Sequence, residues 1–114
     1  MDHSESLKKT RDFQAVYRRG ASAAEKQFVM YVLRNGSDRN RLGISVSKKV
    51  GNSVVRHRVT RLIREGYRLQ EDSFRRGNDI VLVARAAAAD CTQEDAKAGL
   101  RRLGRRLHIW EQKP

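Results

Sequence analysis

Apolar positions along this chain repeat with two different periods, and the changes of period predict its helices and strands. Residues 10–19 place their apolar side chains on one face, as a short amphipathic helix does. Thr10 is expected to cap this helix by accepting a bond from an early backbone N–H, and Gly20 is expected to end it.

Three further segments have the composition of strands. Residues 27–34 are rich in β-branched and aromatic types, and residues 41–47 alternate apolar and polar positions. The polar residues 35–40 between them predict a hairpin with a long loop. Residues 79–84 contain a continuous apolar run after Asp79, which is typical of a central strand that is buried on both faces.

Two longer helices complete the pattern. The first runs from Ser53 to Leu69, with Asn52 or Ser53 as its cap. The second runs from about residue 93 to 107, and Thr92 with Asp95 resembles a capping box at its start. Its arginines are predicted to face away from the core, and they are Arg101, Arg102, Arg105 and Arg106.

A helical wheel of the first long helix separates an apolar stripe from a basic one. Five positions fall within an arc of about 80°, and Ile63 lies about 40° beyond its edge. The five are Val55, Val59, Leu62, Gly66 and Leu69. The opposite side carries Arg56, His57, Arg61, Arg64 and Arg68, with Arg58 near a border. Arg64 and Arg68 lie four residues apart, so they are expected to repel each other without an acidic partner.

The predicted order α-β-β-α-β-α indicates one α+β domain spanning residues 1–114, a two-layer sandwich of a sheet and helices. The strands at 41–47 and 79–84 are joined through a helix, so they would be parallel if they are neighbours. The general rule for such a crossover predicts a right-handed connection.

Charge narrows the function classes. The chain has 25 Lys and Arg against 13 Asp and Glu, which gives a net charge of +12 and a pI near 10.9. Such a surplus in 114 residues indicates a polyanionic partner, a nucleic acid or an anionic membrane surface. No apolar run approaches the roughly 20 residues that span a bilayer, and residues 1–9 lack the apolar stretch of a signal peptide. A cytoplasmic protein is therefore expected, without a membrane partner.

The residue types of a protein active site are scattered. His3, His57 and His108 have no metal-ligand spacing with a cysteine or carboxylate, so no metal site is expected. Cys91, the single cysteine, is expected to be a packing residue. No glycine-rich phosphate loop is present. We expect no catalytic side chain in this protein.

The few aromatic residues lie close to basic ones in the sequence, and rings beside cations form a stacking surface for unpaired bases. Phe13 and Phe28 are expected to be mostly core residues. For Tyr17, Tyr31 and Trp110, base contact and plain packing remain equally open, since a polar ring atom suits a half-exposed position.

Residues 48–65, KKVGNSVVRHRVTRLIRE, resemble the signature of the bacterial ribonuclease P protein subunit. The flanking segments are similar too: Asp12-Phe13 with Val16-Tyr17, then Phe28-Val29 with Tyr31, and the run from Leu42 to Ser47. This sequence departs from the family pattern at two positions. His57 stands in place of an asparagine between two arginines, and Thr60 stands where a basic residue is usual. A neutral imidazole keeps one donor and one acceptor, so His57 can retain a hydrogen-bonding role.

The resemblance implies a fold like the second domain of ribosomal protein S5, with an unusual left-handed strand–helix–strand crossover. It also implies that the protein binds a catalytic RNA, in a 1:1 complex. The positions that would contact this RNA are Lys48, Lys49, Asn52, Arg56, His57, Arg58, Arg61, Arg64 and Arg68.

The resemblance further implies a role in tRNA processing. The complex would remove the 5′ leader of precursor tRNA, with the RNA as the catalyst and Mg²⁺ held mainly by the RNA. The single-stranded leader would lie in a cleft between the first helix and the sheet, against Phe13, Tyr17 and Tyr31, with Trp110 a weaker candidate.

Three alternatives compete with this hypothesis. A non-enzymatic RNA-binding protein of the ribosomal kind fits the composition equally well. A helix-turn-helix DNA binder would need a short helix before the basic helix, where a strand is predicted instead. A protein-only nuclease would need a cluster of carboxylates for metal ions, which the sequence does not contain.

Overall fold

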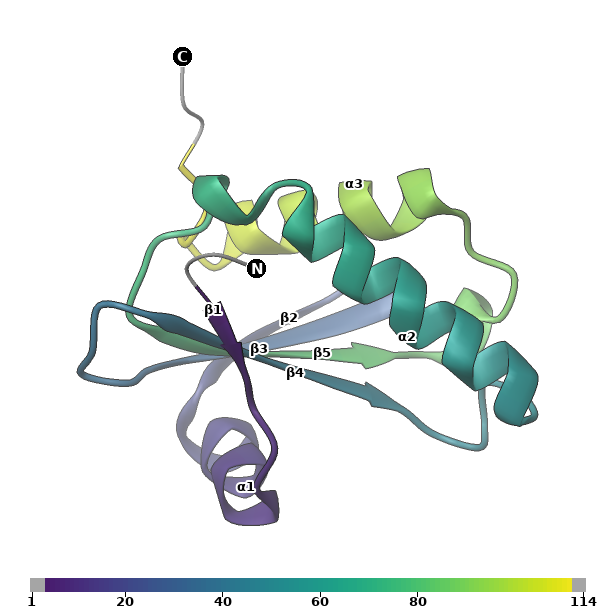
Figure 1. Ribbon diagram of the computed structural model, residues 1–114, viewed down its shortest axis with the longest axis horizontal. Helices are drawn as coiled ribbons and strands as arrows, with labels where there is room; N and C mark the ends of the chain where they lie inside the picture. The colour runs from purple at the N-terminus through teal and green to yellow at the C-terminus, as the bar shows by residue number, and fades with distance from the viewer. Residues whose placement is uncertain (1–3, 112–114) are drawn as a thin grey trace.

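The structure is a computed structural model that describes residues 4–111. It contains one five-stranded mixed sheet in the order β1-β4-β5-β3-β2, with α1 on one face and α2 and α3 on the other (Figure 1). The strands are β1 (Ser4–Ser6), β2 (Ala21–Ala24), β3 (Phe28–Arg34), β4 (Asn40–Val46) and β5 (Asn78–Ala84). The helices are α1 (Thr10–Arg19), α2 (Ser53–Arg68) and α3 (Gln93–Arg106), with short 3-10 helices at Glu71–Ser73 and Ala86–Ala88.

The three helices and three longer strands confirm the sequence prediction to within two residues at each end. The edge strands β1 and β2 were not predicted, because Ser-Glu-Ser and Ala-Ser-Ala-Ala carry no alternation of apolar and polar positions. Their neighbours define them: β1 pairs in parallel with β4, and β2 pairs antiparallel with β3.

The predicted hairpin between β3 and β4 is wrong, because β5 lies between these two strands. β5 pairs antiparallel with β3 and parallel with β4, so Leu82 lies opposite both Met30 and Ile44. A strand that is apolar on both faces gains most burial at the centre of a sheet. Two strand spacings amount to about 10 Å, a gap that the five-residue connection 35–39 can span.

The connection from β4 through α2 to β5 joins two parallel neighbours, as predicted. In Figure 1 both strands run to the right, β4 lies in front of β5, and α2 lies above them. This arrangement makes the crossover left-handed. It agrees with the family resemblance and contradicts the general preference for a right-handed connection.

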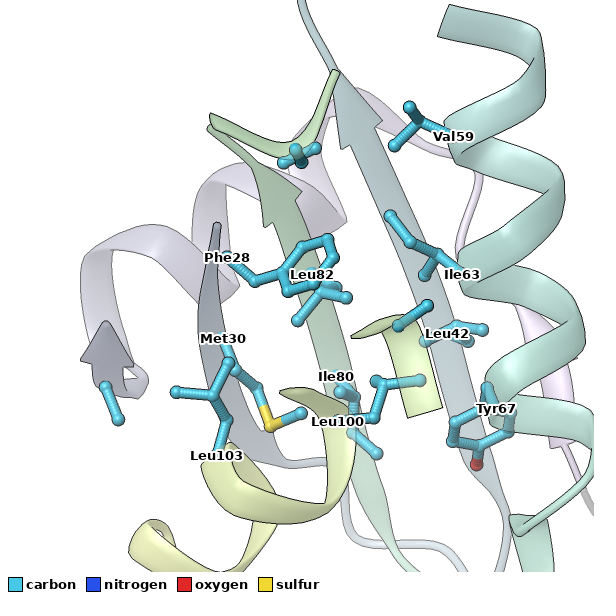
Figure 2. Close-up of a cluster of buried hydrophobic side chains, with 14 of the residues drawn as sticks. Phe28, Met30, Leu42, Val59, Ile63, Tyr67, Ile80, Leu82, Leu100 and Leu103 are labelled. Carbon is cyan, nitrogen blue, oxygen red and sulfur yellow. The ribbon is translucent and has the colours of Figure 1, made fainter. Parts of the chain in front are cut away.

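The main core lies between the sheet and the two longer helices (Figure 2). Phe28 and Met30 from β3 and Leu82 from β5 meet Ile63 from α2 and Leu100 from α3, and all five are fully buried. Figure 2 also shows Leu42, Val59, Tyr67, Ile80 and Leu103 in this layer.

The buried face of α2 is rotated relative to the predicted stripe. Ile63 and Tyr67 are fully buried, whereas Leu69 is 51% exposed just beyond the helix end. α2 packs on α3 as well as on β4, so its buried sector is wider than one contact would require. Gly66 allows the close approach of the two helices, because a β-carbon there would lie 3.3 Å from the backbone nitrogen of Lys97.

A smaller core lies under α1, where Leu7, Val16 and Val81 are buried. The predicted cap at Thr10 is wrong: Lys9 precedes the helix, and its side chain makes no capping bond. The start of α1 is tied to the sheet instead by Arg41, which donates to Asp12 at 3.3 Å and to Asp79 at 2.6 and 2.8 Å.

The four α3 arginines are exposed and face away from the core, as predicted, and two of them also bond to a neighbouring turn. Arg102 donates twice to Glu25, each time at 2.9 Å, and Arg106 donates to the carbonyl oxygen of Ala24 at 2.7 Å. These bonds fasten the β2–β3 turn to α3. The capping box at the start of α3 is confirmed, since Thr92 and Asp95 exchange both bonds.

Tyr67 links three elements through its hydroxyl group and yields a test of the core. Its oxygen lies 2.8 Å from the Ser4 hydroxyl and accepts a bond from the Asn40 amide, and burial raises the pKa of Tyr67 above 10.0. We expect Tyr67→Phe to lower the free energy of unfolding by about 1–2 kcal/mol, because Asn40 and Ser4 lose a buried partner.

The same substitution has a pH signature. An unfolded tyrosine ionises as the pH passes 10.0, whereas the buried one stays neutral, so the wild-type protein loses stability in that range. Phenylalanine lacks this ionisation, and the stability gap between the two proteins should therefore shrink above pH 10.0. Denaturant titrations at neutral and alkaline pH measure the gap, and a pH-independent gap would contradict the expectation.

Candidate nucleic-acid interface

The basic surface begins in the loop before α2. Lys48 and Lys49 are exposed there, and the buried Val50 anchors the loop to the core. Of the two predicted caps, Asn52 is the one used: its side-chain oxygen accepts a bond from the backbone N–H of Val55 at 3.0 Å. Because this bond satisfies one of the free donors of the first turn, the helix starts at a defined place and its basic side chains are held in register.

The outward face of α2 presents His57, Arg61 and Arg64, all exposed, at positions i, i+4 and i+7. They line a shallow hollow along the helix together with Val54, which is 75% exposed. We call Lys48, Lys49, His57, Arg61 and Arg64 the α2 surface. None of these five side chains has a recorded hydrogen bond or ion pair within residues 4–111. The α2 surface is therefore available to a polyanion.

The other predicted RNA contacts on α2 have partners within the protein. Arg58 donates to the carbonyl oxygen of Cys91 at 2.9 Å and to that of Ala89 at 2.5 Å. Arg56 donates from its Nε to the carbonyl oxygen of Gly51 at 3.2 Å. Arg58 thus joins α2 to the start of α3, and its half-buried position matches its place at the border of the wheel.

Arg68 pairs with Glu65, and this interaction lowers the pKa of the Glu65 carboxyl group. The expectation that Arg64 and Arg68 lack an acidic partner nearby is therefore wrong for Arg68, whose charge is balanced within the same turn. Arg68 is exposed, but because it is paired with Glu65 we expect it to attract a phosphate less strongly than Arg61 or Arg64 does.

Three of the predicted aromatic residues gather on the opposite face of the sheet, between α1 and β3. The rings of Tyr17 and Tyr31 meet edge to face with centroids 4.9 Å apart, and Phe13 lies 6.3 Å from Tyr17. Tyr17 is 39% exposed, while Phe13 and Tyr31 are half-buried. We call Phe13, Tyr17 and Tyr31 the aromatic surface.

The sheet beside the aromatic surface is apolar. Val29 and Val83 pair across β3 and β5, both half-buried, because α1 is too short to cover the whole sheet face. Gly43 in β4 lies under the Phe13 ring, and a β-carbon at this position would lie only 2.7 Å from two ring carbons. The sequence analysis did not assign Val29, Gly43 and Val83 to the site. The continuous apolar run of β5 was the available signal, because it predicts that the α1 face of the sheet is apolar beside these residues as well.

Trp110 does not join the aromatic surface. It lies on the other side of the sheet, where its ring meets Phe74 edge to face at a centroid distance of 5.3 Å. Its ring nitrogen is buried, with no hydrogen-bond partner among the described residues. The C-terminal segment folds back on Phe74, a tertiary contact that no local pattern indicates.

The two surfaces meet at the edge of the sheet. Phe13 and Arg64 line one cavity of about 210 Å³ beside β1 and β4. Although they come from opposite layers, a ligand on one surface can thus lie close to a ligand on the other.

The residue types of metal sites are as dispersed in space as in sequence. Within residues 4–111, no three His, Cys, Asp or Glu side chains are grouped so that they could hold a metal ion. His57 and His108 lie on different elements, and His3 lies outside the described residues. Cys91 is buried in the main core, as predicted, and burial raises the pKa of its thiol. No helix in the described part of the chain is long and apolar enough to cross a membrane.

The internal bonds of Arg58 separate it from the α2 surface in a stability experiment. We expect Arg58→Ala to lower the free energy of unfolding by about 1–3 kcal/mol, because the carbonyl groups of Ala89 and Cys91 lose their donor. Arg61→Ala removes the same side chain from an exposed position and should stay within about 0.5 kcal/mol of wild type. Thermal unfolding of both variants measures the difference, and equal losses would refute the structural role of Arg58.

Comparison with known proteins agrees with this geometry. A sequence model of the family Ribonuclease P matches residues 1–108. The ribonuclease P protein component of Lachnoclostridium phytofermentans is 53% identical over 105 residues, covering 92% of this chain and 90% of the relative. That of Clostridioides difficile is 45% identical over 109 residues, covering 95% and 96%.

Solved structures give the same answer. The RNase P protein of Staphylococcus aureus superimposes with a TM-score of 0.84 at 37% identity, covering 93% of this chain and 97% of that one. The RNase P protein of Thermotoga maritima superimposes with a TM-score of 0.80 at 30% identity, covering 89% and 96%. Sequence and fold agree, and the chain belongs to the ribonuclease P protein family.

Proposed function

We propose that this chain is the protein subunit of a ribonuclease P ribonucleoprotein, which removes the 5′ leader of precursor tRNA. The observation that carries the proposal is the pair of surfaces on opposite faces of one sheet. One is basic and suits a folded RNA, and the other is aromatic and suits unpaired bases. A protein with both can hold a catalytic RNA and a single-stranded leader at the same time.

The α2 surface binds the catalytic RNA in this proposal. Its positive side chains approach the phosphate backbone and release counterions, so affinity falls steeply with rising salt concentration. Arg61 and Arg64 can each form forked bonds to a phosphate, and His57 supplies a smaller polar group between them and the lysines. Arg58 holds α2 against the segment before α3, and it also lines the hollow of the α2 surface, where it remains a predicted RNA contact.

The aromatic surface binds the leader. Stacking on Tyr17 and Tyr31 tolerates any base, because every base has a π-face. This tolerance suits a substrate class whose leaders differ in sequence. Val29 and Val83 are half-buried, so they offer the strand an apolar floor, and Gly43 lets the Phe13 ring lie close against the sheet.

The hydrolysis belongs to the RNA partner and its Mg²⁺ ions in this proposal. The α2 surface presents ammonium, guanidinium and imidazole groups, whereas Mg²⁺ takes oxygen ligands. The protein would lower the electrostatic repulsion among RNA, substrate and metal ions. We propose a 1:1 complex of protein and RNA in the cytoplasm.

Of the alternatives, the helix-turn-helix DNA binder lacks its expected geometry, because strand β4 and a loop precede α2. A general RNA-binding protein remains the competitor, and it would bind RNA without supporting cleavage.

Reconstitution tests the proposal directly. A labelled precursor tRNA is incubated at low Mg²⁺ with the protein, with a bacterial ribonuclease P RNA, or with both. We expect cleavage at the mature 5′ end only in the mixture. Cleavage by the protein alone would place an active site on the protein, and a mixture without activity would favour the general RNA-binding protein.

Variants of the two surfaces should separate assembly from leader binding. Arg61→Ala should weaken binding of the catalytic RNA several-fold and leave the preference for leader-bearing substrate unchanged. Tyr17→Ala should reduce that preference by about tenfold, since a lost stack is worth about 1–3 kcal/mol, and should spare assembly. Gly43→Ala should act like Tyr17→Ala by displacing the Phe13 ring. Binding titrations with leader-bearing and leaderless tRNA distinguish these outcomes, and equal losses in both assays would refute the two-surface model.

A further inference from the structure

A third surface feature lies outside both surfaces described above. A groove of about 580 Å³ runs between the end of α3 and the ends of β2 and β3. Its lining includes Arg34, Arg75, Arg76, Leu107, His108 and Glu111. We call this the α3-end groove.

Strand register places the groove far from the start of α2. Arg34 pairs with Asn78 at one end of the sheet, and Phe28 pairs with Ala84 at the other. Six residues of extended strand separate these ends by about 20 Å. Lys48 follows β4 at the Ala84 end, because Val46 pairs with Ala84. The groove and the start of the α2 surface therefore lie at opposite ends of the sheet.

The groove also lies on the other face from the aromatic surface. Val32 points into the main core under α3, and Arg34, two residues further along β3, shares that face. α1 covers the opposite face (Figure 1), where Tyr17 of α1 meets Tyr31 of β3. A ligand in the groove would not occupy either surface already described.

The lining of the groove carries more positive than negative side chains, and the further acids Glu71 and Asp72 line an adjoining pocket with Arg76. Glu111 is the acidic lining residue, and it pairs with Arg75 at 3.0 Å. Arg34 and Arg76 are exposed, and neither has a recorded hydrogen bond or ion pair with any residue between 4 and 111. Two free guanidinium groups that line one concavity repel each other, and an anion between them would remove that repulsion.

The loop that carries Arg76 is held in place by backbone bonds. Arg75 donates its N–H to the carbonyl oxygen of Ile109 at 2.7 Å, and the carbonyl oxygen of Gly77 accepts from Asn35 at 2.9 Å. Gly77 has a φ of 94°, and a β-carbon there would lie 2.7 Å from the carbonyl oxygen of Ser37. Arg76 is therefore presented from a fixed backbone, which lowers the entropy lost on binding.

His108 adds an independent observation. Its φ is 61°, a left-handed conformation that is unfavourable for residues with a β-carbon and is usually taken by glycine at this place after a helix. Its N–H and that of Ile109 donate to the carbonyl oxygens of Arg105 and Gly104, so these helix-end acceptors are satisfied. Glycine would make the same turn without strain. Histidine adds only a side chain, and that side chain is exposed and lines the groove.

We infer that the α3-end groove is a second RNA-binding site, in which Arg34, Arg76 and His108 hold backbone phosphates. The inference rests on the proposed function and extends it, because it gives the protein a contact about one sheet length away from the start of α2. The phosphates belong either to the catalytic RNA or to the precursor tRNA. Both have the same chemistry, and the experiment distinguishes them.

The test measures binding as a function of salt for Arg34→Ala/Arg76→Ala. One arm titrates the variant with a bacterial ribonuclease P RNA, and the other titrates the assembled holoenzyme with precursor tRNA. Each lost phosphate contact should reduce the slope of log affinity against log salt by roughly 0.7–0.9, so the double variant should lose about 1.5. The affinity itself should fall about tenfold at moderate salt. His108→Gly should weaken binding of the same RNA that the double variant binds less tightly, and it should not lower the unfolding temperature of the protein.

Two controls accompany the double variant. Arg34→Lys/Arg76→Lys retains the charges and should keep most of the salt slope. Arg101→Ala removes an exposed arginine of α3 that does not line the groove, and it should change the slope by less than the double variant does.

The arms give distinct outcomes. A reduced slope with the catalytic RNA alone assigns the groove to that RNA, and a reduced slope only with precursor tRNA assigns it to the substrate. If the double variant keeps the wild-type salt slope in both arms while Arg61→Ala reduces the slope for the catalytic RNA, the groove is not an RNA-binding site. The proposed function would then remain intact. A slope reduced equally by the lysine variant would overturn the phosphate interpretation. Absence of RNA binding by the wild-type protein would overturn the proposed function and the groove together.

Discussion

The position of β5 at the centre of the sheet is the constraint on which the rest of the structure depends. Six of its seven residues are buried, and its side chains alternate between the two cores. A strand that is apolar on both faces must be covered on both. α2 and α3 cover one face together, and α1 covers the other. The two candidate RNA surfaces lie on these opposite layers because the central strand requires both layers to exist.

The two helix layers differ in size, and this difference explains why the aromatic surface is partly exposed. α2 and α3 bury their side of the sheet completely along Phe28, Met30 and Leu82. α1 has ten residues and leaves Val29 and Val83 half-buried. A short helix on a wide sheet thus produces an apolar floor with rings along one side. Arg41, which joins Asp12 of α1 to the nearly buried Asp79 of β5, holds α1 at this position.

The arginines of this protein have two different uses. Some face outward and give the chain its surplus of positive charge, as Arg61 and Arg64 do. Others donate hydrogen bonds to carbonyl or carboxylate oxygens of a neighbouring element and so hold two elements together. Arg58 joins α2 to the start of α3, and Arg102 joins α3 to the β2–β3 turn. Guanidinium has five donors in a planar fork, so it can bind two acceptors at once. A count of the positive charges along a helix therefore overestimates the charge that is free to meet a partner.

Features that depend on neighbours in sequence could be read from the chain itself. The bounds of α2, the capping box of α3, the buried β5 and the family signature from Lys48 to Glu65 are all local patterns. Phe13, Tyr17 and Tyr31 lie together, whereas the prediction that Trp110 joins them is wrong, because the C-terminal segment returns to Phe74, 36 positions earlier in the chain. The edge strands had no pattern of their own and exist through pairing.

Hydrophobic period thus determined the three helices and the three longer strands, because the pattern of apolar positions is local in sequence. The left-handed crossover followed from the family resemblance, whereas the general rule for crossovers predicted the other hand. Tertiary structure alone decided the insertion of β5 between β3 and β4 and which arginines bond within the protein. Those outcomes depend on which apolar faces and carbonyl groups meet after the chain has folded, and residues far apart in sequence supply both partners. The α3-end groove belongs to the same class, since β3, the Arg75–Arg76 loop and the end of α3 meet only in the folded protein.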